Sequence, residues 1–176
     1  MFFKKLNDGN EVPMLGLGTW QQIEKEKCIH AIKIALKMGY RHIDTADIYQ
    51  NHEYIKEGIK GFVREQLYIT SKLWRDFLNP NLVESQCDKI LFELGVDYLD
   101  LCLVHWPDST KPLSEISYQM SLLKEKGKVK SIGVSNYTIN HLQDLIDQNI
   151  QIQVNQVEYH PYLNQSDLLE FCNRHS

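Results

Sequence analysis

Two hydrophobic periods alternate along this chain. Short apolar-rich runs of strand length recur, and each is followed by a stretch whose apolar residues repeat with a helical period. We expect strands at 14–20, 42–46, 67–73, 98–105, 129–134 and 152–157. We expect the helices that follow them at 27–38, 52–60, 80–94, 113–126, 139–148 and 165–174. Regular alternation of strand and helix predicts an α/β fold with a parallel sheet.

Residues with strong local preferences mark several helix ends. Asn79 suits an N-cap and Pro80 suits the first helical position, where no backbone N–H is needed, so we expect a helix to begin there. Gly39, Gly95 and Gly127 follow three of the expected helices and predict their C-terminal ends.

The chain begins with a hairpin signal and then continues as strand–helix units. Residues 2–6 and 11–15 flank a turn that contains Asp8-Gly9, a pair typical of β-hairpins. No GxGxxG follows the first core strand, which favours a (β/α)8 TIM-barrel type over a dinucleotide-binding doubly wound sheet. A full barrel has eight units and roughly 250 residues. About six are present, so we expect residues 1–176 to form a single, incomplete barrel, truncated at its C-terminus, whose unpaired edges promote association.

Composition limits the function classes. A net charge of −4 and 43% hydrophobic residues are ordinary for a globular protein and indicate neither nucleic acid nor an anionic membrane as partner. We expect buried thiols, not disulfides, at the four widely spaced cysteines Cys28, Cys87, Cys102 and Cys172. The sequence shows no signal-peptide or transmembrane pattern, so we expect a cytoplasmic location.

Side chains that could take part in catalysis lie where the expected strands end. Asp44, Lys72 and His105 each close an apolar-rich run, and Tyr49 lies in the loop after the first of these. In a barrel the C-terminal strand ends meet at one rim, where active sites lie. Each residue alone is equally compatible with a solvated strand end or a private salt bridge. Their convergence from successive units favours an active site.

Longer motifs give the chain a specific resemblance. They are LGLGTW at 15–20, GYRHIDTADIY at 39–49, ITSKLW at 69–74, DLCLVHWP at 100–107, IGVSNY at 132–137 and NQVEYHPY at 155–162. In this order and spacing the chain resembles the aldo-keto reductase family, and within it the small bacterial-type reductases of diketogluconate and related carbonyls. The resemblance implies reduction of a small-molecule carbonyl by NADPH, the cofactor that most of the family prefers.

The same resemblance implies roles for individual residues. It implies a catalytic tetrad of Asp44, Tyr49, Lys72 and His105, and an N-terminal hairpin that plugs the barrel bottom. It further implies contacts to the nicotinamide carboxamide from Ser135, Asn136 and Gln156. Substrate contacts are expected from Trp20, His105 and Trp106. In the family, most contacts to the rest of the cofactor come from the last two strands and the helix beyond, which cannot be assigned here.

Elementary chemistry gives each member of this tetrad a task. Carbonyl reduction needs a hydride at carbon and a proton at oxygen, and Tyr49 is the candidate acid. A phenol has an ordinary pKa of about 10, which a neighbouring Lys72 ammonium is expected to lower. Asp44 would keep that ammonium charged, and His105 would donate a hydrogen bond to the substrate oxygen.

Other readings of the same residues stay open. Lys72 could instead be the nucleophile of a Schiff-base lyase on the same barrel, or the chain could be a non-enzymatic fragment of a disrupted gene. Trp74 also follows a strand end, where its side chain could either form a wall of the substrate pocket or pack in the core. Asp47 either affects substrate choice or faces solvent. His160 has no metal-ligand spacing with Cys102 or His105, so we expect no metal site.

Overall fold

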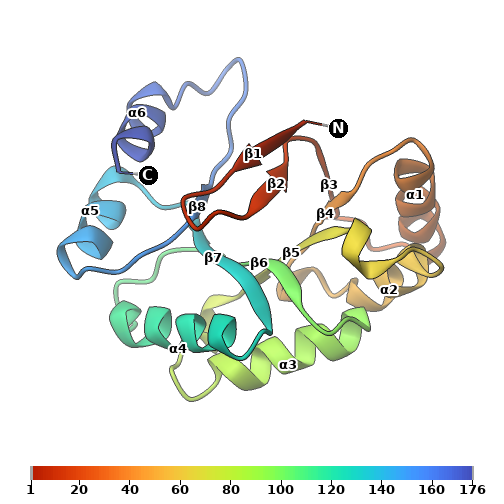
Figure 1. Cartoon of the computed structure of the whole chain (residues 1–176), viewed down its shortest axis with the longest axis horizontal. Coiled ribbons are helices and arrows are strands. Elements are labelled where there is room, and N and C mark those ends of the chain that lie inside the picture. Colours follow the sequence, from red (N-terminus) through yellow and green to blue (C-terminus); the bar gives the residue numbers. More distant parts are fainter. Residues whose placement is uncertain (1, 176) are drawn as a thin grey trace.

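The computed structural model describes residues 2–175, which form an antiparallel hairpin followed by alternating parallel strands and helices (Figure 1). The strands are β1 (Phe3–Lys5), β2 (Glu11–Pro13), β3 (Gly16–Gly18), β4 (His42–Asp44), β5 (Tyr68–Leu73), β6 (Leu99–Val104), β7 (Val129–Ser135) and β8 (Val154–Gln156). The helices are α1 (Lys25–Lys37), α2 (His52–Ile59), α3 (Val83–Leu94), α4 (Leu113–Glu125), α5 (Ile139–Asp147) and α6 (Ser166–Arg174). Short 3₁₀ turns are η1 (Asp47–Tyr49), η2 (Arg64–Gln66) and η3 (Arg75–Phe77).

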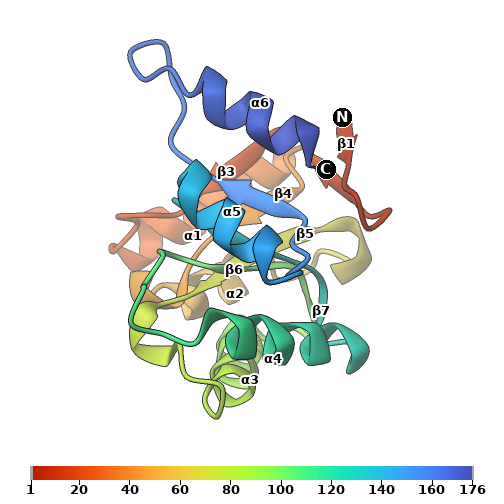
Figure 2. The same ribbon diagram turned by 90° about the vertical axis from the view of Figure 1, so that its left-hand side faces the viewer.

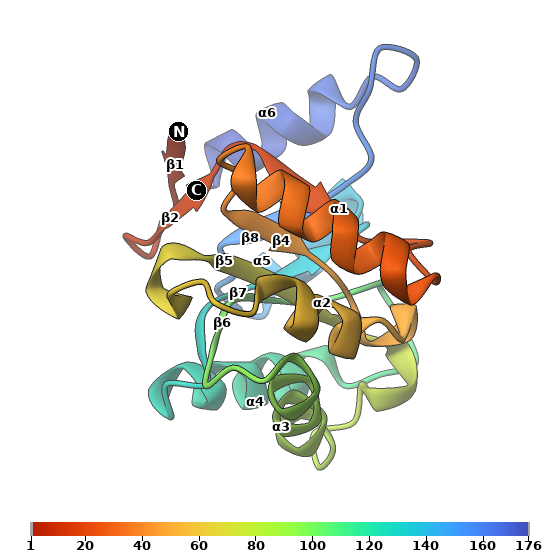
Figure 3. The ribbon, with the colours of Figure 1, turned by 90° about the vertical axis from the view of Figure 1, so that its right-hand side faces the viewer.

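The main sheet has the order expected of an opened barrel. Strands β3 to β8 pair in sequence order, all parallel, and within the described residues β3 and β8 each have one strand neighbour. The sheet curls, with helices around its outside (Figure 1), and α1 and α2 lie side by side (Figure 3). Helices α5 and α6 lie on the side of β8 (Figure 2). The predicted α/β fold with about six barrel units is confirmed.

Strand periodicity sorts side chains between the two faces of the sheet. On β5, Ile69 and Leu73 point outward into the main hydrophobic core under the helices, whereas the intervening Thr70 and Lys72 face inward. On β4, Ile43 joins the outer core and Asp44 faces inward beside Lys72. The same alternation that builds the core therefore places charged groups inside the curl.

The hairpin turn packs across the N-terminal ends of the later strands. Oδ2 of Asp8 accepts hydrogen bonds from Nζ of Lys124, at 3.0 Å, and from Oγ of Ser131, at 2.8 Å. Nδ2 of Asn7 donates to the carbonyl of Ile152 at 3.2 Å. Gly9 in the turn has a φ of +88°, which favours glycine. The hairpin thus lies at the bottom of the barrel, opposite the strand ends that carry the candidate site.

The first turn expected for α3 does not form. The helix begins at Val83, not at Pro80, and Oδ1 of Asn79 accepts a hydrogen bond from the backbone N–H of Asn81. This Asx-type turn uses Asn79 to close a loop instead of capping a helix. The prediction of a helix start at Asn79-Pro80 was therefore wrong by about one turn.

All four cysteines are free, but they are not equally buried. Cys28, Cys87 and Cys102 are buried in the core, whereas Cys172 on α6 is half-buried, which corrects the expectation for that residue. Among residues 2–175, the helices are all too short or too polar to cross a membrane.

Candidate active site

An ion pair inside the curled sheet forms the base of the candidate site. Asp44 and Lys72 pair through Oδ1 and Nζ, and the same Nζ donates to the carbonyl of Thr45 at 2.9 Å. The second carboxylate oxygen of Asp44 accepts a hydrogen bond from Nε2 of Gln156 at 2.7 Å. Lys72 is 2% exposed, so an ammonium there requires these partners. Burial lowers the pKa of Lys72, and Asp44 opposes that shift.

The loop that carries Tyr49 is held by a buried asparagine. Asn51 stands at the N-cap position of α2, but its side chain makes no capping bond. Its Oδ1 instead accepts from Oγ1 of Thr45 at 3.0 Å, and its Nδ2 donates to the carbonyl of Thr19 at 2.8 Å. Gln50 adopts left-handed backbone geometry, with φ of 54°, and so turns the chain from η1 into α2. Asn51 therefore links the ends of β3 and β4 around the Tyr49 loop.

Tyr49 and His105 meet above the ion pair. The hydroxyl of Tyr49 lies 3.5 Å from Nε2 of His105, and the two rings stack edge to face with centroids 5.6 Å apart. Nζ of Lys72 lies 5.5 Å from the centroid of the Tyr49 ring. The structure thus brings together Asp44, Tyr49, Lys72 and His105, the four residues predicted to form the tetrad.

The electrostatics of the two proton-carrying groups differ. Burial, followed by the Lys72 charge, lowers the pKa of His105 to about 4, so this imidazole is neutral at physiological pH. Burial, followed by the charges of Asp44 and Asp47, raises the pKa of Tyr49 to about 12. The sequence led us to expect a Tyr49 pKa below 10. The pKa is raised instead because burial disfavours the phenolate and the negative charges of Asp44 and Asp47 add to that effect.

The three residues predicted to contact the carboxamide lie next to this group. Oγ of Ser135 donates to the backbone carbonyl of Gln156 at 2.9 Å, and Nδ2 of Asn136 donates to the carbonyl of His105 at 3.0 Å. Asn136 has a left-handed φ of 64°, and its backbone N–H donates to the same Gln156 carbonyl. The amide nitrogens of Asn136 and Gln156 are engaged, and among residues 2–175 no donor is found for their amide oxygens. These oxygens could accept hydrogen bonds from a primary amide, which fits a nicotinamide carboxamide.

The predicted pocket tryptophans lie at the rim. Trp20 is 67% exposed and Trp106 is 46% exposed. Trp106 and Asn136 line a cavity of about 690 Å³ between the loops that follow β7 and β8. Trp74 has a different position, since its ring lies 5.3 Å from that of His105 in edge-to-face geometry. The sequence is compatible with Trp74 either as a wall of the substrate pocket or as a core residue. Its contact with His105 depends on tertiary structure and has no sequence signal.

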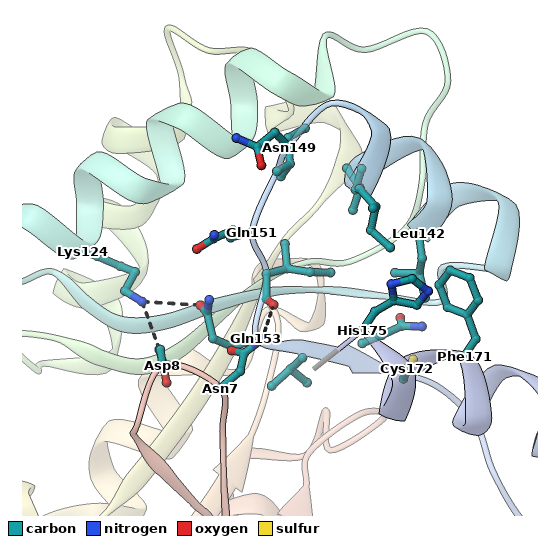
Figure 4. Close-up of a pocket in the computed structure, with 16 residues that line it drawn as sticks. Asn7, Asp8, Lys124, Leu142, Asn149, Gln151, Gln153, Phe171, Cys172 and His175 are labelled. Atoms are coloured by element: carbon teal, nitrogen blue, oxygen red, sulfur yellow. Dashed lines mark hydrogen bonds and ion pairs between the residues drawn. The ribbon is translucent and has the colours of Figure 1, made fainter.

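A second cavity, of about 530 Å³, lies away from this chemistry. It opens where the hairpin turn, α5 and the last turn of α6 meet the segment that leads into β8 (Figure 4). Asn7, Gln153 and Phe171 line it, whereas none of the tetrad does. In the described part of the chain, no three His, Cys, Asp or Glu side chains gather to hold a metal ion.

Comparison with known proteins finds matches over nearly the whole chain. The model of the Aldo/keto reductase family matches residues 14–176. The chain is 42% identical to glyoxal reductase of Bacillus subtilis over 171 residues and 41% identical to aldose reductase C of Dictyostelium discoideum over 202 residues. These matches cover 96% and 97% of this chain but only 62% and 63% of those relatives, so the chain spans less than two thirds of their length.

Solved structures extend the likeness to three dimensions. A crystal structure of an aldo/keto reductase from Brucella melitensis is 41% identical, with a TM-score of 0.92, and the match covers 98% of this chain and 69% of that one. An aldo-keto reductase from a deep-sea metagenome library is 38% identical, with a TM-score of 0.93. The chain therefore belongs to the aldo/keto reductase family.

Proposed function

We propose that this chain carries the chemical groups of an NADPH-dependent reductase that converts small aldehydes and ketones to alcohols. The observation that supports this most directly is the meeting of the Tyr49 hydroxyl and the His105 imidazole over the Asp44–Lys72 pair. When bound, the nicotinamide cofactor would supply the hydride, and the protein must supply orientation and a proton.

Tyr49 is the proton donor in this proposal. A pKa of about 12 keeps the phenol protonated across the physiological range, so it is always ready to donate. Such a donor transfers its proton only as negative charge develops on the substrate oxygen, when that oxygen becomes the stronger base. Lys72, 5.5 Å from the ring centroid, would stabilise the negative charge left on Tyr49.

His105 binds and orients the carbonyl oxygen. Because its pKa is lowered to about 4, it is a neutral imidazole with one N–H, a hydrogen-bond donor and not an acid. Its Nε2 lies 3.5 Å from the Tyr49 hydroxyl, so an oxygen placed to one side of this pair would be within hydrogen-bond distance of both groups. Two donors aimed at one oxygen would stabilise the charge that develops on it.

Ser135, Asn136 and Gln156 would orient the carboxamide of the cofactor. Gln156 also bonds to Asp44, so the group that would hold the carboxamide is tied directly to the ion pair below Tyr49. This connection would fix the face of the nicotinamide ring that is presented to the substrate. Trp20 and Trp106 would form the outer wall of the substrate pocket.

The Schiff-base lyase is the less favoured function. A nucleophilic lysine must be free and deprotonated, but Lys72 is 2% exposed, paired with Asp44 and bonded to the Thr45 carbonyl. We also propose a cytoplasmic setting, supported by three buried free thiols in the core.

The test uses the purified 176-residue chain with millimolar NADPH and glyoxal, the substrate class suggested by the name of the Bacillus subtilis relative. We expect weak cofactor binding and slow oxidation of NADPH that depends on the aldehyde. Y49F should lower that rate by about 10² to 10⁴. A rate equal in Y49F and wild type would overturn the proposed role of Tyr49, and low-micromolar NADPH affinity would overturn the expectation of weak binding.

A further inference from the structure

We propose that Asp47 is a positioning residue, whose carboxylate clamps the turn carrying Tyr49 to the end of β5 and to α3 and thereby sets the geometry around His105. The relevance of this clamp to catalysis rests on the proposed function, whereas the clamp itself does not.

One carboxylate oxygen of Asp47 joins three separate elements. Oδ2 accepts a hydrogen bond from the backbone N–H of Trp74 at 2.9 Å and another from Nε2 of Gln86 at 3.1 Å. Asp47 opens η1, the turn that ends at Tyr49, whereas Trp74 directly follows β5 and Gln86 lies on α3. These two hydrogen bonds therefore tie η1 to the end of β5 and to α3.

Aromatic contacts connect the residues held by this clamp to His105. Trp74 lies edge to face with His105 at 5.3 Å, and Tyr49 contacts the same imidazole at 5.6 Å. Nδ1 of His105 is buried, and no hydrogen-bond partner is found for it in residues 2–175. The orientation of the His105 ring therefore depends on its packing between Trp74 and Tyr49, the two residues that Asp47 ties together.

The environment of Asp47 lowers the folding stability of the chain, which is unexpected for a residue with only a structural role. Its Oδ1 is buried and lacks a partner among the described residues, and burial raises its pKa. An incompletely satisfied buried carboxylate lowers stability, and such groups concentrate at functional sites. Because its bonded oxygen faces protein donors, Asp47 does not simply face solvent, which was one of the two alternatives that the sequence suggested.

Two variants of Asp47 separate its charge from its hydrogen bonds. D47N retains an acceptor oxygen and removes the charge, whereas D47A removes both. Asp76 provides the matched control, since it is an exposed acid in the neighbouring turn η3 and is varied in the same two ways. All measurements use the 176-residue chain without cofactor or substrate, so their failure is distinct from failure of the proposed reductase activity.

The first measurement is amide hydrogen exchange. D47A should accelerate exchange of the Trp74 amide by up to about tenfold, the value of one net hydrogen bond, and should shift the His105 ring resonances. D76A should change neither. The clamp is refuted if exchange at Trp74 and the His105 resonances are the same in D47A as in wild type.

The second measurement is the titration of Tyr49, assigned by comparison with Y49F in protein labelled with ¹³C at the tyrosine ring. D47N should move the Tyr49 pKa down from about 12 towards its ordinary value of about 10, and D76N should leave it unchanged. Because D47N keeps an acceptor oxygen for Trp74 and Gln86, its shift reports the lost charge, whereas a larger shift in D47A would report lost burial of the phenol as well. Equal Tyr49 titration in D47N and D76N would contradict the placement of Asp47 beside the phenol.

A measurement on wild-type protein covers the case in which the Asp47 variants do not fold. Protonation of the carboxylate must weaken the bond from Trp74, so the Trp74 amide proton should titrate together with the Asp47 carboxyl carbon, with a midpoint above 3.8. An amide proton that does not follow this carboxyl group would refute the clamp without any substitution.

Discussion

The buried pair of Asp44 and Lys72 can be tested through its contribution to folding stability. Removing one partner of a buried ion pair costs about 3–5 kcal/mol, because the other charge stays buried without compensation. D44N should approach this cost, since Lys72 is 2% exposed and its buried ammonium loses the negative charge with which it pairs. K72M should cost less, because the Asp44 side chain is 17% exposed and still accepts from Gln156.

Urea unfolding of the two single variants and the double variant D44N/K72M measures this directly. With a urea dependence of about 1–3 kcal/mol per molar, the D44N midpoint should fall by roughly 1–5 M relative to wild type. The double variant should be more stable than the sum of the single effects allows, by about 1–3 kcal/mol, because it leaves no isolated charge. Additive losses would show that the two groups are not coupled.

The pH dependence of D44N gives an independent check. Burial already lowers the pKa of Lys72 in the folded chain, and loss of Asp44 removes the group that opposes this shift. The unfolded chain then binds more protons than the folded chain, so the stability of D44N should rise with pH up to the ordinary lysine value of 10.5. A D44N cost below about 1 kcal/mol that does not change with pH would refute the buried-pair reasoning.

Three further predictions concern the histidines and the sheet. The ring protons of His105 should titrate near pH 4, and K72M should raise that midpoint because the Lys72 charge is removed; an unchanged midpoint would contradict the contact. Stability should fall between pH 7 and pH 5 by roughly 1–2 kcal/mol through His105, because its pKa of about 4 means that the imidazole binds a proton in this range only in the unfolded chain, and His52, whose pKa is also lowered, should add to the fall; a flat profile in urea unfolding would contradict their neutral burial. G133A should lower the free energy of unfolding by about 1–3 kcal/mol because its methyl group would collide with the β8 backbone, whereas G18A has open space and should be tolerated; equal losses in thermal unfolding would refute this.

The fold was predictable because its signals are periodic. Alternation along the segments around Asp44 and Lys72 fixes which residues face inward, and parallel pairing then brings both groups to the same rim. Gly16 illustrates a second readable signal, since a side chain there would collide with the ring of His42 on the adjacent strand. Helix boundaries were predicted less accurately, because asparagine is common both in Asx turns and at helix N-caps. At Asn79 the side chain closes an Asx turn, and the helix begins later.

The fine geometry of the candidate site was not predictable from sequence. The contact of Trp74 with His105, and the two bonds that Asp47 accepts, join elements whose relative placement depends on packing of the whole outer layer. A carboxylate two residues before Tyr49 gives no sequence signal for a backbone N–H more than twenty residues away. Such contacts follow from tertiary structure, which local propensity and period cannot specify.

The raised pKa of Tyr49 follows from the same arrangement and changes how the site should be understood. An isolated ammonium would favour the phenolate, but Tyr49 is partly buried, Lys72 is paired with Asp44, and Asp44 and Asp47 both place negative charge near the ring. The phenol therefore holds its proton until a neighbouring oxygen becomes strongly basic, which suits donation during reduction and opposes abstraction of a proton from an alcohol. In the proposed reaction, this environment would keep Tyr49 in its proton-donating form at neutral pH, and loss of the Asp47 charge would lower the pKa of Tyr49.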